Sequence, residues 1–410
     1  MSFPRQRDCA RIPLGYNPPT LSPAPMSLDL QQVLPQVELL GQEAARRAAE
    51  VAARLPQASR WLDEAARLDP AELRRRLANA PATSQPALPT DERIDRRFPL
   101  PPHPTRLRLM AADGSQIYPD RHAPAFFYML NIGSVAMVHG SGQPPQVHTR
   151  SSLHYQEEEV HDSRGLPIDT LVNAQRDAAE IAELARLAAE GEEVETPMLA
   201  LLDNGLLLWA ASQEQRATRP DVQKVLGEVL AALDRLHASG AALAGYISRP
   251  RGANVVALAE AAGGASPGAL RGLTDRALFG SRLDPGARSA RFLHPADLNQ
   301  TFAERGHAIQ FFYLHTGAQD GVARVEVPAW VGDDPQRLAM VHAGIVEQCR
   351  ITGIPYPLVR AHELALVGQN DRRALDDLVR AALVRQGLTA LASQKAQTKR
   401  WTARRRRHRL

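Results

Sequence analysis

The amino-acid sequence predicts an α/β fold built on one mixed sheet, in which antiparallel strands come before parallel strand–helix units. Three strand-like runs joined by short connections lie between residues 105 and 155, a pattern that is typical of antiparallel pairing. Two short apolar runs, at 198–203 and 242–248, then alternate with two long helix-forming segments. Apolar strands that are linked through helices indicate parallel crossovers, so one sheet is expected to contain both kinds of pairing.

Each element is predicted from a local pattern. The first three strands are expected in RLRLMAAD, which ends on Asp113, in PAFFYMLNIGSVAMV and in QVHTRSSLHY. Long helices are expected over 168–190, 221–237 and 335–353, and a hairpin-like pair in IQFFYLHTG and VARVEVPAWV. Residues 27–80 predict helices, because leucines and valines recur near helical spacing and EAARRAAEVAARL is rich in helix formers. A mixed sheet flanked by helices, here with a helical N-terminal extension, is the layout of the ribonuclease-H-like fold.

Composition divides the chain of 410 residues into five parts. They are a Pro-rich N-terminal arm (1–26), a helical extension (27–80), a linker (81–104), a main domain (105–390) and a basic C-terminal tail (391–410). The formal net charge is +4, but the last eighteen residues hold eight Lys or Arg and no acid, which leaves −4 for residues 1–392. We expect the tail to contact a polyanion such as nucleic acid; the alternative is a passive, solvated tail.

Several protein classes are excluded by the same numbers. A hydrophobic content of 44% and a charged content of 23% are ordinary for a globular protein. No apolar run reaches the roughly 18–20 residues of a membrane span, and the N-terminus lacks the apolar core of a signal peptide. The two cysteines, Cys9 and Cys349, fit a reducing compartment. We therefore expect a soluble, cytoplasmic protein with no membrane partner. The absence of P-loop, GxSxG and HExxH motifs weakens the usual ATPase, hydrolase and zinc-protease interpretations.

Two acidic residues share one setting in the predicted sheet. Asp113 and Asp203 each end a predicted strand, and Gly-Ser and Asn-Gly follow them. Carboxylates at the tips of neighbouring strands can hold divalent cations, and a pair of such cations can act on a phosphodiester. The alternative is that these acids simply make turns after the strands.

Three further candidates are weaker on sequence grounds. Helical periodicity places Glu180 on a polar face with Arg176, where a solvated ion pair is the plain alternative. His362 follows PYPLV, which we expect to be extended, so it is placed near a helix start. Such an imidazole either ligates a metal, handles a proton or is structural. The run from His154 to Asp162 also resembles a ligand cluster, although strand alternation would scatter its side chains over both faces.

Arginines outside the tail are candidates for contacts with a nucleic-acid backbone. They follow the second parallel strand or lie in the irregular segment SRLDPGARSARF, and the DNA-binding set is Arg249, Arg282, Arg288 and Arg291, with Arg404, Arg405, Arg406 and Arg407 from the tail. The alternative is that they are ordinary surface residues.

Seven stretches, taken in order, resemble the NurA nuclease family. They are MAADGSQ (110–116), the helix with Arg176 and Glu180, LALLDNGLLLW (199–209), GYISRP (245–250), LTDRALF with PGARSARF (273–292), FFYL with VARVEVPAWV (311–331), and PYPLVRAHELAL (355–366). The resemblance covers roughly residues 105–385. One departure is Asn204, where the family more often has Gly; because Asn tolerates left-handed backbone, we expect the turn to survive.

The resemblance implies a manganese-dependent 5′-to-3′ DNA exonuclease, with single-strand endonuclease activity in many members. It implies a homodimer that works with a HerA-type hexameric translocase on DNA ends in recombination and double-strand-break repair. Carried over residue by residue, it places Asp113, Glu180, Asp203 and His362 at a catalytic metal site for two Mn²⁺ ions, with Mg²⁺ as an alternative. Two other interpretations stay open: a catalytically silent adaptor or DNA clamp on a translocase, and another ribonuclease-H-like phosphotransferase such as a resolvase.

Overall fold

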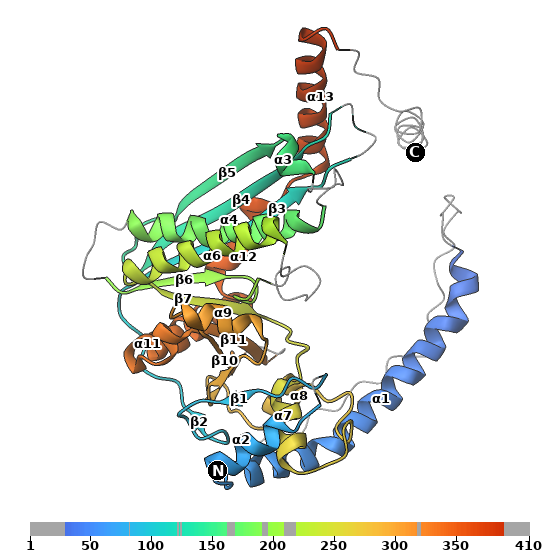
Figure 1. Ribbon diagram of the computed structural model, residues 1–410, viewed down its shortest axis with the longest axis vertical. Helices are drawn as coiled ribbons and strands as arrows, with labels where there is room; N and C mark the ends of the chain where they lie inside the picture. Colours follow the sequence, from blue (N-terminus) through green and yellow to red (C-terminus); the bar gives the residue numbers. More distant parts are fainter. Residues whose placement is uncertain are drawn as a thin grey trace, which may run out of the picture. The chain divides into compact units, whose positions relative to one another are not determined.

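The computed structural model describes residues 29–81, 83–120, 123, 125–161, 169–190, 196–208, 219–317 and 321–388. The chain divides into two compact units, Met1–Ala53 and Arg54–Leu410. The sheet and nearly all of the described elements belong to the second unit (Figure 1). The expected N-terminal arm and basic tail lie outside the described residues.

The elements follow the predicted order along the chain. The strands are β1 (Leu88–Pro89), β2 (Arg97–Phe98), β3 (Leu107–Ile117), β4 (Tyr128–His139), β5 (Gln146–His154), β6 (Met198–Leu202), β7 (Ala242–Ile247), β8 (Arg288–Ser289), β9 (Phe292–Leu293), β10 (Ile309–His315) and β11 (Val322–Pro328). The helices are α1 (Leu30–Ala65), α2 (Pro70–Ala78), α3 (Glu157–Val160), α4 (Asp169–Ala189), α6 (Pro220–Ala238), α7 (Asn254–Ala262), α8 (Asp275–Gly280), α9 (Leu298–Glu304), α10 (Ala329–Gly332), α11 (Pro335–Thr352), α12 (Tyr356–Ala365) and α13 (Gln369–Arg385).

The described strands form one mixed sheet. Its main path runs β1-β9-β10-β11-β7-β6-β3-β4-β5, with β2 and β8 attached beside it. Strands β3, β4 and β5 pair antiparallel, whereas β3, β6 and β7 pair parallel through helical crossovers. The predicted ribonuclease-H-like layout, antiparallel strands followed by parallel units, is therefore confirmed, and so is the β10–β11 hairpin.

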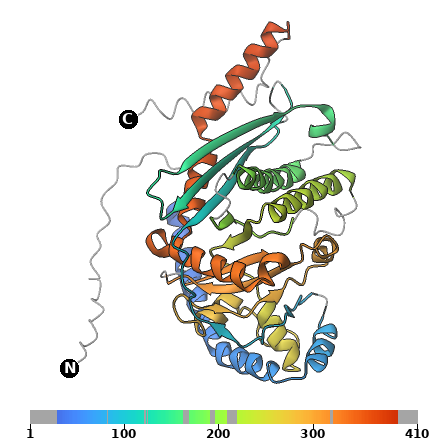
Figure 2. The same cartoon turned by 90° about the vertical axis from the view of Figure 1, so that its left-hand side faces the viewer.

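Alternation along the central strands assigns each face of the sheet to different helices. On β3, Met110 and Ala112 join the core formed with α4 and α6, while Leu109 and Ala111 join the core formed with α11 and α12. Figures 1 and 2 show these helix pairs on opposite faces of the sheet. Each buried Leu or Met contributes about 1.5–3 kcal/mol, so both layers hold the strands firmly in register.

Two expectations about local structure are wrong. Residues 88–89 and 97–98 lie in the expected linker, but they form the strands β1 and β2, which pair with β9 and β8. The segment PYPLV is helical rather than extended, because α12 begins at Tyr356 with a proline in its first turn. Proline is well tolerated there, since the first helical N–H groups have no partner inside the helix.

No helix within the described ranges is long and apolar enough to cross a membrane.

Candidate metal centre

The parallel register of β3 and β6 brings Asp113 and Asp203 side by side. The last pair in this register is Ala112 with Leu202, so each aspartate is the next residue along its own chain. Asp203 follows the end of β6, as predicted, but β3 continues through Asp113 to Ile117. Partial burial and the negative charge of Asp113 together raise the pKa of Asp203 above its ordinary value.

His362 lies beside Asp113, although the two residues are 249 positions apart in the sequence. It lies in the last turn of α12, not at a helix start as we expected, and its side chain is 57% exposed. The imidazole Nδ1 lies 2.7 Å from Asp113 Oδ2. We assign the ring proton to Nδ1, because a carboxylate oxygen accepts the hydrogen bond, and this assignment leaves Nε2 free to face a cation.

Glu180 is buried, so the solvated ion pair that helical periodicity offered as an alternative is wrong. It is 5% exposed and lies on α4, with its Oε1 3.2 Å from Arg176 Nε. Burial raises its pKa well above the ordinary value, and Asp177 and Asp113 add to this effect, whereas Arg176 and the Gly114 N–H oppose it. A buried carboxyl group whose pKa is raised in this way, close to other carboxylates, is typical of a functional site.

Gly114 allows Glu180 to approach the sheet so closely. A Cβ atom at Gly114 would lie 2.6 Å from Arg176 Cγ and 2.8 Å from Glu180 Oε1. Any larger residue would therefore push the α4 side chains away from β3. The Asp-Gly pair combines an acid on the α12 face with an open position on the α4 face.

The loop after β6 is held by groups that sequence reasoning missed. Leu206 donates its N–H to Glu326 Oε2 at 2.9 Å, and a Cβ at Gly245 would lie 2.4 Å from Asn204 O. Asn204 keeps the turn without left-handed backbone, because its Oδ1 accepts the Gly205 N–H at 2.9 Å. Glu326 lies far away in sequence, on β11, so only the sheet order could reveal this contact.

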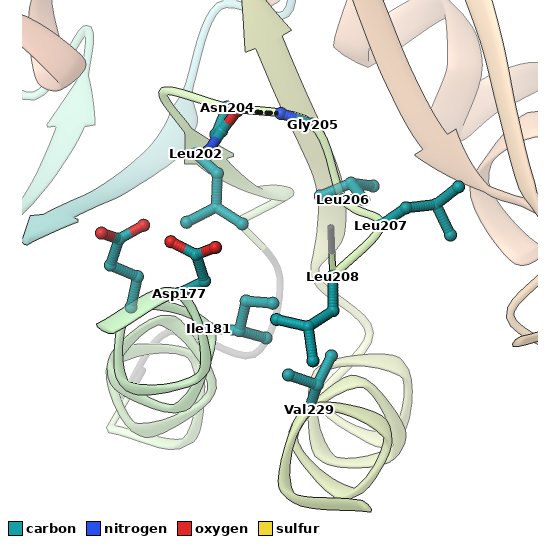
Figure 3. A pocket seen from close by; sticks show the side chains of 10 residues that line it. Asp177, Ile181, Leu202, Asn204, Gly205, Leu206, Leu207, Leu208 and Val229 are labelled. Carbon is teal, nitrogen blue, oxygen red and sulfur yellow. Dashed lines mark hydrogen bonds between the residues drawn. The ribbon is translucent and has the colours of Figure 1, made fainter. Parts of the chain in front are cut away.

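A small pocket opens between α4 and this loop. Asp177, which the sequence analysis overlooked, points toward it from α4, opposite Asn204 (Figure 3). Burial raises the pKa of Asp177, although its ion pair with Arg176 at 2.7 Å opposes that shift. Glu180 also lines this pocket, so two carboxyl groups of α4 border the Asp203 loop.

The donor set suits a divalent cation. Within the part of the chain that the structure describes, no three His, Cys, Asp or Glu side chains are gathered tightly enough to ligate one ion. Burial raises the pKa values of Glu180 and Asp203, and neighbouring carboxylates raise them further, so a cation placed among these groups would relieve that repulsion. Mn²⁺ accepts both carboxylate oxygens and an imidazole nitrogen as ligands. Mg²⁺ accepts the carboxylate oxygens.

One known family matches most of the domain that carries these residues. The NurA domain model matches residues 107–367, which is more than half of the chain. The chain belongs to the NurA family. The crystal structure of the NurA nuclease from Sulfolobus solfataricus superposes with a TM-score of 0.52 at 12% identity, covering 86% of this chain and 98% of that one. That likeness establishes a shared fold.

Two other solved structures are more distantly similar. A structure of NurA bound to dAMP and manganese has a TM-score of 0.37 at 12% identity, covering 69% of this chain and 90% of that one. The catalytic domain of human endonuclease V has a TM-score of 0.32 at 15% identity, covering 76% and 94%. No curated protein matches the sequence.

Two arginines expected to contact DNA have structural roles in this NurA-family chain. Arg288 and Arg291 are buried, and both pair with Glu92, at 2.8 Å and 3.2 Å. Burial alone would raise the pKa of Glu92, but the two guanidinium groups outweigh it and lower that pKa. The prediction that Arg288 and Arg291 bind DNA is therefore wrong, since their charges are already neutralised inside the fold.

The remaining candidates differ in their surroundings. Arg282 donates to Asp63 at 2.5 Å and is largely buried against α1, which leaves little of it for DNA. Arg249 is exposed just after β7, at the edge of the sheet that carries Asp203. Arg404, Arg405, Arg406 and Arg407 lie outside the described residues.

The run from His154 to Asp162 does not gather into a ligand cluster in its described part. His154 Nδ1 lies 3.1 Å from Glu159 Oε1 and its ring stacks on Tyr128, while the ring of His161 stacks on Phe126. Asp162 lies outside the described residues.

Proposed function

We propose that this NurA-family chain is a metal-dependent DNA nuclease whose metal site consists of Asp113, Glu180, Asp203 and His362. One observation carries the proposal: the β3–β6 register sets two carboxylates side by side, and His362 is hydrogen-bonded to one of them. Glu180 contributes a third carboxylate from α4 on the far side of Gly114. The four residues come from four separate elements, so the fold itself assembles them.

Asp113 and Asp203 would hold the cation, and Glu180 would add a third carboxylate to balance its positive charge. When bound, Mn²⁺ or Mg²⁺ would supply positive charge that polarises the scissile phosphodiester and stabilises the charge developing on it. His362, fixed through Nδ1, would present Nε2 as a further ligand or as a carrier of a proton. Arg176, paired with Glu180, partly offsets the rise that burial causes in the pKa of that carboxyl group.

The finer assignments follow from the family resemblance and the charge distribution. They are 5′-to-3′ exonuclease polarity, single-strand endonuclease activity, a homodimer, and work with a HerA-type hexameric translocase on DNA ends in recombination. Arg249 and the basic tail would contact the DNA backbone. Their charge suits that role because each phosphate neutralised releases a condensed counterion.

A digestion assay tests the proposal. Single- and double-stranded DNA, labelled at the 5′ or the 3′ end, is incubated with Mn²⁺, Mg²⁺ or chelator, with and without a cognate translocase. The proposal predicts digestion that needs a divalent cation, and release of label from the 5′ end first. DNA binding without digestion under every condition would contradict it and would favour the silent adaptor.

A further inference from the structure

A row of polar side chains crosses three strands beneath the C-terminal end of α12. Ser115 on β3 pairs in register with Asn131 on β4, and Asn131 pairs with Ser151 on β5. Ser115 lies two residues beyond Asp113 on the same strand, and therefore on the same face of the sheet. The row thus runs directly beside the proposed metal centre.

The row binds the end of the helix that carries His362. Asn131 donates Nδ2–H to Ala365 O at 2.9 Å, and Ser115 donates its hydroxyl to the same carbonyl. Ser151 donates to Asn131 Oδ1 at 2.7 Å, which fixes the orientation of the amide. Asn131 is 6% exposed, and its bond to Ala365 O is buried, whereas the bonds donated by Ser115 and Ser151 are partly buried.

Helix ends normally satisfy their last carbonyl groups with water, a glycine-based cap or a basic side chain. Here the donors come from the sheet, so they fix the position of α12 along its axis and its rotation about that axis. His362 and Ala365 are three residues apart and lie on neighbouring positions of one helix face. A turn of about 20° at a side-chain radius of about 5–6 Å would move the imidazole by about 2 Å, which exceeds the tolerance of a hydrogen bond.

We infer that Asn131, assisted by Ser115, is a positioning residue that holds the His362 imidazole against Asp113. The expected effect on kcat rests on the proposed nuclease function. The position of the imidazole against Asp113 does not depend on that function. Loss of such supporting contacts reduces metal affinity or activity by about 10–100-fold in known metal sites. We expect Asn131→Ala to reduce kcat by that factor at saturating Mn²⁺ and DNA, and Ser115→Ala to have a smaller effect in the same direction.

A double-mutant cycle separates positioning from general destabilisation. If Asn131 acts through His362, then Asn131→Ala lowers kcat in the parent but causes no further loss in a His362→Ala background. The matched control is Asn299, which is 4% exposed and donates to the carbonyls of His294 and Ile309, both at 3.0 Å. Asn299→Ala is expected to weaken folding while leaving kcat nearly unchanged. Equal losses in both backgrounds, or equal losses from the two asparagines, would overturn the inference.

A second measurement does not depend on activity. In the metal-free full chain with ¹⁵N-labelled histidine, the Nδ1 resonance of His362 is assigned by its loss in His362→Ala. We expect Asn131→Ala and Ser115→Ala to shift or broaden that resonance, and Asn299→Ala to leave it in place. An unchanged resonance in Asn131→Ala refutes the positioning role. If the parent digests no DNA, the proposed function fails, but this spectrum still decides the inference.

Discussion

Gly133→Ala is a sharp test of how α12 brings His362 to the sheet. Gly133 pairs with Asp113 in the β3–β4 register, and the backbone of α12 passes directly over it. A Cβ at this position would lie 2.5 Å from both Ala361 O and Ala365 N, whereas ordinary contacts begin at 3.4 Å. The helix must therefore retreat by about 1 Å, because the opposing atoms are backbone and cannot rotate away.

Two effects of that retreat can be estimated. Overpacking of this kind lowers the free energy of unfolding by about 1–3 kcal/mol. A displacement of about 1 Å in a catalytic group costs about 100-fold in rate. We expect Gly133→Ala to remain folded in a urea titration and to lose about two orders of magnitude in kcat for DNA digestion.

Gly227→Ala is the matched control. Gly227 lies on the exposed side of α6, and a Cβ there would meet nothing within 4 Å. Alanine favours a helix over glycine by about 1 kcal/mol, so this variant should be more stable with unchanged digestion. A folded Gly133→Ala protein that digests DNA at the parental rate would refute the proposed role of α12.

Other predictions concern the charges. Asp113→Asn and Asp203→Asn should each abolish digestion while circular dichroism and urea midpoints change little, since each removes a ligand charge and not a core contact. Glu92→Gln should lower the free energy of unfolding by about 3 kcal/mol at pH 7, because the buried Arg288 loses the carboxylate with which it pairs. Arg291 keeps Asp91 and Asp333 as partners. Because the folded pKa of Glu92 lies below 4.5, this difference should persist above that pH and disappear as pH falls through the lowered value. His362→Ala should reduce Mn²⁺-supported digestion more than Mg²⁺-supported digestion, since imidazole prefers transition metals. Deleting residues 393–410 should weaken DNA binding and flatten the slope of log affinity against log salt, with the rate for bound DNA unchanged.

The fold could be predicted from sequence because its signals are local. The apolar strands β6 and β7 and the helices between them carry their own periodicity, and their order implies the parallel crossover. The strands β1 and β2 could not be predicted, because each has two residues in a Pro-rich segment. They are strands only through distant partners, β9 and β8.

The candidate site was predictable only in part, for the same reason. Asp113 and Asp203 follow from strand patterns, whereas helical periodicity placed Glu180 in solvent. Helical periodicity describes one helix alone, so it cannot predict that the missing side chain at Gly114 on β3 leaves space for Glu180. Periodicity could not predict the burial of Arg288 and Arg291 either, because Glu92, one carboxylate that pairs with both, lies nearly 200 residues earlier.

An anomalous-difference map from a crystal of the full chain soaked in Mn²⁺ tests the metal centre most directly. We expect a peak within ligand distance of the carboxylates of Asp113 and Asp203, with Glu180 or His362 beside it. The peak should vanish in Asp113→Asn crystals that keep the same fold. A Mn²⁺ peak held by none of these four residues, or no peak at a Mn²⁺ concentration that supports digestion, would contradict the assignment.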